Sequence, residues 1–189
     1  QYINPLSLMG IDQDIDLSEI DAKLIQKYKK LLLQEIELEN GNIPWLTNCQ
    51  VDKSRAIAVC DELLNDDLTY FNWTVFKDKK LNNFLQAGDI EHFLVEDDDS
   101  RTETFDFIFK KEGALDWLSP KFSTQYSYVL GKAIQNRNIP YVECLTQGRR
   151  WVAEKYDDAC FQDAVAEIKN IIVDLSRIES QSEITKPNI

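Results

Sequence analysis

The chain has 189 residues, of which 43% are hydrophobic and 29% are charged, and both fractions are ordinary for a folded protein. A chain of this length buries roughly two-thirds of its unfolded surface, so it needs neither a disulfide nor a metal to fold. Its formal net charge of −12 repels phosphate backbones and anionic lipid headgroups, which argues against nucleic-acid and membrane partners.

The first elements that the sequence predicts are helical. Residues 4–11 have the pattern of one short helical turn that ends at a glycine. Asp16 and Glu19 have the spacing of a capping box, which predicts that a longer helix begins there. Apolar residues then recur every three or four positions, as in one core-facing stripe, until Asn40-Gly41 ends the helix. This stripe consists of Leu17, Ile20, Leu24, Tyr28, Leu31 and Leu32.

The segment from residue 47 to residue 94 predicts several shorter helices. Thr47 or Asp52 can cap a helix that places four apolar residues on one face. Residues 65–67, Asn-Asp-Asp, are expected to break it. An aromatic stretch then predicts one or two helices that stop at Gly88, followed by a short turn at 90–94. The four apolar residues of the first helix are Ile57, Cys60, Leu63 and Leu64.

The acidic run at 96–101 is predicted to be a solvated loop and the boundary between two lobes. Phenylalanines at 105, 107 and 109 make the next stretch the most strand-like in the chain, although it could equally begin a helix, because a lone strand has no partner. Ser119-Pro120 predicts the N-cap and first residue of a helix that ends at 136–138, and a short helix is expected at 141–145. The longest element is expected from Trp151 to Glu179. Its apolar residues from Ala164 to Ile178 recur at alternating spacings of four and three, which indicates a bundle seam or a short coiled-coil seam.

These patterns predict an all-α fold, an irregular helical bundle with at most a minor β element near 103–110. We expect an N-terminal helical lobe at 1–95, a C-terminal helical lobe at 103–180, and a loose tail at 181–189. The residues expected in the core are Leu24, Tyr28, Leu31, Ile57, Leu63, Val129, Ile168, Ile171 and Leu175.

The first forty residues resemble a degenerate J domain, a co-chaperone module. The resemblance rests on residues 4–11, Asn-Pro-Leu-Ser-Leu-Met-Gly-Ile, and on 18–20 and 28–31, which are similar to the short first helix and the long basic second helix of that family. The His-Pro-Asp tripeptide that should follow is replaced by residues 34–38, Gln-Glu-Ile-Glu-Leu. The resemblance therefore implies a J-like helical hairpin at 4–40 that serves as an interaction surface, without stimulation of a chaperone ATPase.

No residue pattern points to a cofactor, a metal site or a reactive centre. The only histidine, His92, excludes a multi-histidine metal site and is interpreted as a structural residue. The aspartates at 12, 14 and 16 imitate the start of a calcium loop, but the sixth and twelfth positions hold Leu17 and Lys23, so we reject the site. The sequence also has no glycine-rich phosphate loop and no nucleophile elbow. The sequence therefore favours binding over catalysis.

The cysteines indicate a reducing compartment. None of the four belongs to a C-x-x-C pair, and Cys60 and Cys160 lie on apolar helical stripes, which suits buried, reduced thiols. The sequence shows no secretory signal and no apolar run near the length of a membrane span. We therefore expect a cytoplasmic protein.

Three hypotheses for the function follow. The first is a non-catalytic protein-interaction or adaptor domain that binds another protein or itself, with a partner surface at Tyr70, Phe71, Trp73 and Phe76, since these cannot all face the same way on one helix. The second is an acidic mimic of nucleic acid that inhibits a nucleic-acid enzyme. The third is an enzyme with an unfamiliar acidic site around Glu91, His92 and Glu96.

Overall fold

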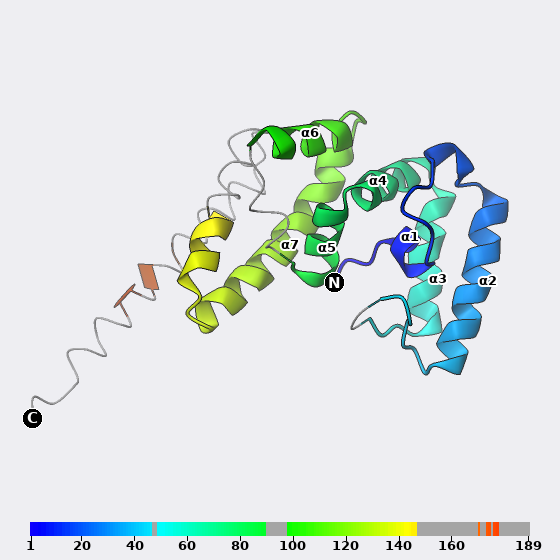
Figure 1. Ribbon diagram of the computed structural model, residues 1–189, viewed down its shortest axis with the longest axis horizontal. Helices are drawn as coiled ribbons and strands as arrows, with labels where there is room; N and C mark the ends of the chain where they lie inside the picture. Colours follow the sequence, from blue (N-terminus) through cyan, green and yellow to red (C-terminus); the bar gives the residue numbers. More distant parts are fainter. Residues whose placement is uncertain (47–48, 90–97, 147–169, 171–172, 175, 178–189) are drawn as a thin grey trace, which may run out of the picture. The chain divides into compact units, whose positions relative to one another are not determined.

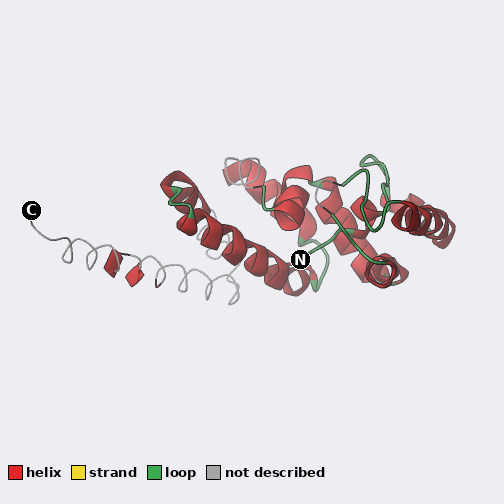
Figure 2. Cartoon of the chain, turned by 90° about the horizontal axis from the view of Figure 1, so that it is seen from below, coloured by secondary structure: helices red, strands yellow, loops and turns green. Residues whose placement is uncertain are grey.

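The computed structural model of the chain describes residues 1–46, 49–89, 98–146, 170, 173–174 and 176–177. In these residues the regular structure is helical, and the one β feature is an isolated bridge between Asn42 and Gln50 (Figure 2). The all-α prediction is therefore confirmed. The expected turn at 90–94, the candidate His92, Cys160 and the expected seam at 164–178 fall on positions outside the described residues.

The chain divides into two compact units, residues 1–117 and residues 118–189. This division falls inside the helix Ala114–Gln135. The sequence analysis placed the boundary between two lobes at the acidic run 96–101. Asp98, in that run, is already the first residue of a helix, so the second half of the run is not the loop that the sequence predicted.

The first unit begins with short elements that lead into one long helix (Figure 1). Helix α1 spans Pro5–Leu8, the 3₁₀ turn η1 spans Leu17–Glu19, and helix α2 spans Ala22–Leu38. The capping box of Asp16 and Glu19 is confirmed, but it caps the start of η1 and not of the long helix. The start of α2 is capped by the Asp21 side chain, which accepts a hydrogen bond from Leu24 N. The long helix therefore starts later than the sequence predicted.

The next four elements of the first unit follow closely on one another. They are α3 (Lys53–Asp61), η2 (Glu62–Leu64), α4 (Asp66–Lys77) and α5 (Lys79–Ala87). Asp52 caps α3 as predicted, and Gly88 ends α5 with a left-handed φ of 72°. Asn65 accepts a hydrogen bond from Leu68 N, so the Asn-Asp-Asp tripeptide that was expected only to end a helix also begins the next one.

The next two helices along the chain are α6 and α7. Helix α6 spans Asp98–Ile108, which resolves the strand-like stretch as helix, and α7 spans Ala114–Gln135. Pro120 lies inside α7 and not at its first residue, so the predicted start at Ser119-Pro120 is wrong. A proline inside a helix removes one backbone hydrogen bond but does not prevent the helical φ. Residues 139–146 form a further helix, close to the predicted 141–145.

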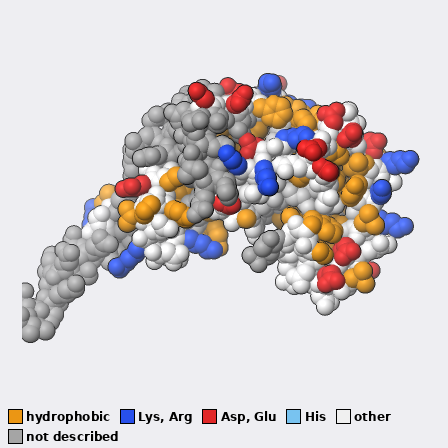
Figure 3. All heavy atoms as spheres, in the orientation of Figure 1, with side chains coloured by type: hydrophobic (Ala, Val, Ile, Leu, Met, Phe, Trp, Pro, Cys, Tyr) orange, Lys and Arg blue, Asp and Glu red, His pale blue; other side chains and the backbone are white. Residues whose placement is uncertain are grey.

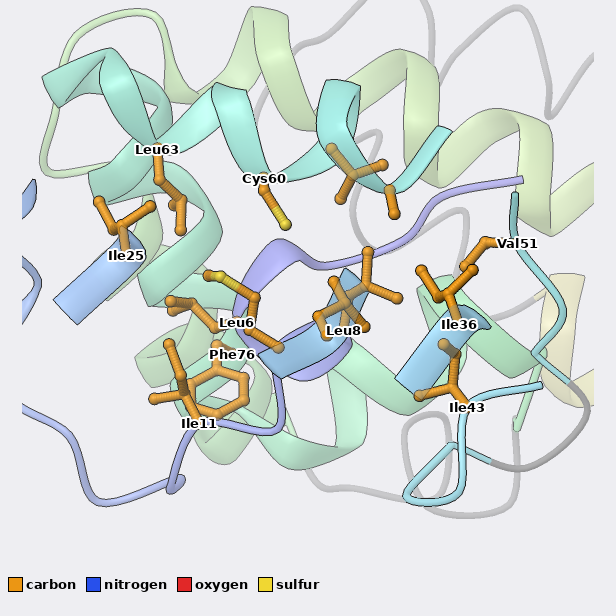
Figure 4. Close-up of a cluster of buried hydrophobic side chains, with 14 of the residues drawn as sticks. Leu6, Leu8, Ile11, Ile25, Ile36, Ile43, Val51, Cys60, Leu63 and Phe76 are labelled. Carbon is orange, nitrogen blue, oxygen red and sulfur yellow. The ribbon is translucent and has the colours of Figure 1, made fainter. Parts of the chain in front are cut away.

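The core of the first unit surrounds the short helix α1 (Figure 4). The α1 side chains Leu6 and Leu8 are fully buried, and residues from α2, α3, α4 and the 41–51 loop pack around them. The members of this cluster that Figure 4 labels are Leu6, Leu8, Ile11, Ile25, Ile36, Ile43, Val51, Cys60, Leu63 and Phe76.

A buried network of amides ties the first residues of the chain to α4. Tyr2 Oη donates to Asn72 Oδ1 at 2.7 Å, and Asn4 Nδ2 donates to the backbone oxygen of Asn72 at 2.9 Å. Asn72 Nδ2 in turn donates to Glu62 Oε2 at 3.1 Å. Asn4 and Asn72 are both fully buried, and these bonds offset the loss of water around their amides.

The helical part of the second unit carries the stripe that the sequence predicted on α7. Phe122, Tyr126, Val129 and Ala133 are all buried, and the rings of Phe122 and Tyr126 stack with centroids 5.8 Å apart. Val129 is thus confirmed as a core residue.

Candidate functional site

Helix α2 carries two apolar stripes along its length. One stripe, Ile25, Leu32 and Ile36, is buried in the core of the first unit. The other consists of Leu24, Tyr28, Leu31 and Leu38. With 3.6 residues per turn, the second stripe lies about 100° around the helix from the first. The helix is therefore apolar over a wider arc than the core of the first unit covers.

The second stripe is open to water, increasingly so toward the end of the helix. Leu24 and Tyr28 are half-buried at the edge of the core, whereas Leu31 is 48% exposed and Leu38 is 74% exposed. Glu35, also half-buried, interrupts the stripe between these two leucines. Large apolar side chains that stay in water together on one element are typical of a binding surface.

These exposures correct part of the core predicted from the sequence. Leu63 is buried as expected, and Leu24 and Tyr28 are only partly buried. Leu31 and Ile57, which is 37% exposed, are surface residues, so their assignment to the core is wrong. The predicted core residues Ile168, Ile171 and Leu175 lie outside the described residues.

A row of lysines borders the second stripe on the side away from the core. Lys23, Lys27 and Lys30 are exposed, and they take part in no ion pair within the described part of the chain. Lys27 Nζ lies 5.8 Å from the centroid of the Tyr28 ring, a cation–π contact on the surface itself. We call the seven residues Leu24, Tyr28, Leu31, Leu38, Lys23, Lys27 and Lys30 the α2 surface.

The other lysines near α2 are already paired with carboxylates. Lys29 Nζ contacts Asp61 Oδ1 at 2.7 Å, and Lys53 pairs with Glu37, so both join α2 to α3. Figure 3 shows blue Lys and Arg side chains along the edge of the molecule where Figure 1 draws α2, with hydrophobic side chains next to them. The α2 surface is thus a local concentration of positive charge on a chain of net charge −12.

The site residues predicted on α4 do not form one exposed surface. Phe71 is 5% exposed and Phe76 is 6% exposed, so both belong to the core. Tyr70 and Trp73 are half-buried on another face of the helix. Trp73 Nε1 donates to the backbone oxygen of Ile15 at 3.0 Å.

Lysines of the chain itself lie over the two half-buried rings. Lys111 Nζ is 5.1 Å from the centroid of Tyr70, and Lys77 Nζ is 5.8 Å from that of Trp73. The α4 aromatics are therefore mostly engaged within the first unit, in contrast to the leucines of the α2 surface.

Two features of the described residues bear on catalysis. They contain no group of three or more His, Cys, Asp or Glu side chains that could hold a metal ion. Burial raises the pKa of the Cys60 thiol to about 11, with smaller opposing effects from Lys29 and Asp61, and burial also raises the pKa of Cys49. Both thiols are therefore protonated and weakly nucleophilic at neutral pH.

A hollow of about 430 Å³ opens between the first residues of the chain, the 45–50 loop and α5. Trp45, Cys49 and Gln86 are among its lining residues, and none of the lining side chains is a carboxylate or an amine. Tyr2 also lines it, and burial together with the charge of Glu62 raises the pKa of its hydroxyl well above the ordinary value. None of the lining side chains is therefore poised to exchange a proton at neutral pH.

Comparison with known proteins identifies no relative: the chain matches no family model, no curated protein and no solved structure. The resemblance to a J domain accordingly stays a prediction. Among the described helices, none combines the length and the apolar composition that a bilayer crossing requires.

Proposed function

We propose that the chain is a non-catalytic protein-interaction domain of the cytoplasm, and that it binds its partner through the α2 surface. The observation that carries the proposal is the pair Leu31 and Leu38, exposed by 48% and 74% on one stripe beside lysines that have no ion pair in the described residues. An apolar centre with a charged rim is the usual composition of a protein interface.

Two further features support the proposal. The stripe is part of a helix whose other apolar stripe is fixed in the core, so the surface is presented on an already folded element that needs no ordering on binding. The thiols of Cys49 and Cys60 are not in disulfides, as is usual for proteins of the reducing cytoplasm. The proposal does not depend on the J-domain resemblance, although a J-like hairpin would present the same helix.

The test compares proteins captured from native lysate by three forms of the full chain. The first is the unchanged protein, and the second carries Leu31→Ser and Leu38→Ser. The third carries Leu64→Ser, a matched control, because Leu64 is 71% exposed on η2 and lies outside the α2 surface. All three should have the same circular dichroism spectrum, since the substituted side chains stand in water.

We expect the unchanged chain and the Leu64→Ser variant to retain the same partner, and the double variant to lose it. Sedimentation of the purified chain shows in parallel whether the partner is a second copy. Capture by the double variant that equals capture by the unchanged chain would refute the proposed surface.

A further inference from the structure

Resting on the proposed function, we infer that the segment bound by the α2 surface is an acidic amphipathic helix of another protein. Three properties of the surface lead to this partner: its backbone groups are already hydrogen-bonded within the helix, its apolar stripe has the length of a short helix, and its lysines lie along one border.

The backbone of α2 excludes a partner that pairs as a β-strand. Strand addition requires an exposed sheet edge with unpaired backbone groups, and the described residues contain no sheet. The N–H and C=O groups inside a helix already bond to one another. Recognition by α2 must therefore use side chains, and side chains of one helix interlock best with the ridges of a second helix.

The dimensions of the stripe match a short helix. From Leu24 to Leu38 the stripe is about 21 Å long, because each helical residue rises about 1.5 Å. Its leucines and tyrosine repeat at spacings of three, four and seven, which is the spacing of the anchors when one amphipathic helix lies along another. A partner helix of about four turns would cover the whole stripe.

The lysines select the charge of that helix. Lys23, Lys27 and Lys30 repeat at spacings of four and three, so they run parallel to the apolar stripe along one border. Carboxylates at the same period on a partner helix would meet all three ammonium groups. The net charge of −12 acts against an acidic partner only at long range, because salt at physiological concentration screens charges beyond about 8 Å. At contact the three lysines outnumber Glu35, the acidic residue within the stripe.

The same row of charges argues against two other occupants. A basic helix would bring its own cations against the lysines. A second copy that packed its α2 antiparallel to this one would place the two lysine rows on the same side of the contact. Like charges held close together in this way are destabilising.

The experiment measures the binding of two fluorescein-labelled helical peptides to the full chain by fluorescence anisotropy. Both peptides carry leucines at heptad spacing, and they differ only in having glutamates or lysines beside the leucines. We expect the acidic peptide to bind, with an affinity that falls as salt rises from about 0.05 M to about 0.5 M, and the basic peptide not to bind.

Charge-reversal variants separate the local effect from the net charge. The variant Lys23→Glu, Lys27→Glu, Lys30→Glu should bind the acidic peptide at least tenfold more weakly and should gain binding of the basic peptide, since three exposed pairs of up to about 1 kcal/mol each are reversed. The matched control Lys79→Glu, Lys80→Glu, Lys110→Glu changes the net charge equally at exposed positions outside the α2 surface and should leave the affinity within about twofold.

Equal binding of both peptides, or an equal loss in the control variant, would overturn the inference. So would a dimer in sedimentation that Leu31→Ser and Leu38→Ser abolish, because the occupant would then be a second copy. If those leucine substitutions release a captured partner that the acidic peptide does not displace, the proposed function stands and the inference about the partner's chemistry falls.

Discussion

Two adjacent leucines on α2 provide the sharpest test of which stripe is buried. Leu32 is fully buried, whereas Leu31 is 48% exposed. Replacing each by alanine changes the intrinsic helix propensity equally, so this contribution cancels between the two variants. The difference in their free energies of unfolding therefore reports packing alone.

The expected magnitudes follow from burial. Leu32→Ala removes buried methyl and methylene groups and leaves a cavity in the core of the first unit, so it should lower the free energy of unfolding by about 3 kcal/mol. Leu31→Ala loses only part of the transfer free energy of a leucine and leaves no closed cavity, so it should lower it by about 1 kcal/mol.

Urea unfolding followed by tryptophan fluorescence and circular dichroism measures the difference. With a slope of about 2 kcal/mol per molar urea, the two unfolding midpoints should differ by about 1 M. Equal shifts, or a larger shift for Leu31→Ala, would refute the assignment of the two stripes, and with it the physical basis of the α2 surface.

Three further predictions test other parts of the structure. Gly10 has a φ of +68°, and an added Cβ would lie 3.1 Å from the Trp45 ring, so Gly10→Ala should lower the melting temperature. Gly131 is the control, because it has a helical backbone and open space around it. Gly131→Ala should therefore leave the melting temperature unchanged or raise it. Burial raises the pKa of the Cys60 thiol from 9.0 to about 11, so the thiol of the unfolded chain ionises first as pH rises. The free energy of unfolding should therefore fall by about 1 kcal/mol between pH 8 and pH 10 in urea titrations, and Cys60→Ala should remove that part of the pH dependence. Asn4→Ala deletes the cap of α1 and removes the side-chain donor to the buried Asn72 carbonyl, which should lower the free energy of unfolding by about 2 kcal/mol in the same assay.

Helix boundaries were predictable from the sequence where one side chain decides them. Asp52 and Gly88 act through their own hydrogen bonds and backbone conformation, so local residues are sufficient evidence. Asn65 is the informative exception, because the residue that was expected to break one helix uses its side chain to start the next. The same residue types begin helices and end them, so only the residues that follow show which role a given residue has.

Periodicity failed where two periods fit the same residues. Phe105, Phe107 and Phe109 alternate as in a strand, but Phe105 and Phe109 are also four apart, and in α6 and just beyond it their rings stack with centroids 5.7 Å apart. Either structure brings apolar groups together, so the alternation alone could not decide between them.

The exposed face of α2 could not be identified from the sequence, for a related reason. The sequence showed the apolar residues of α2, including Leu31, but the adjacent Leu32 belongs to a stripe of equal quality. Which stripe is buried depends on where α1 and α3 pack, and that is a property of the folded chain. The surplus of aromatic residues on α4 was a misleading signal, since Phe71 and Phe76 fill the interior.

The amide network around Asn72 has a practical consequence for anyone who shortens the chain. Without residues 1–4, the Asn72 side-chain oxygen and backbone carbonyl would each lose a hydrogen-bond donor, and α1 would lose its cap. A protein trimmed by these few residues should therefore melt at a lower temperature, even though such ends are commonly discarded as dispensable.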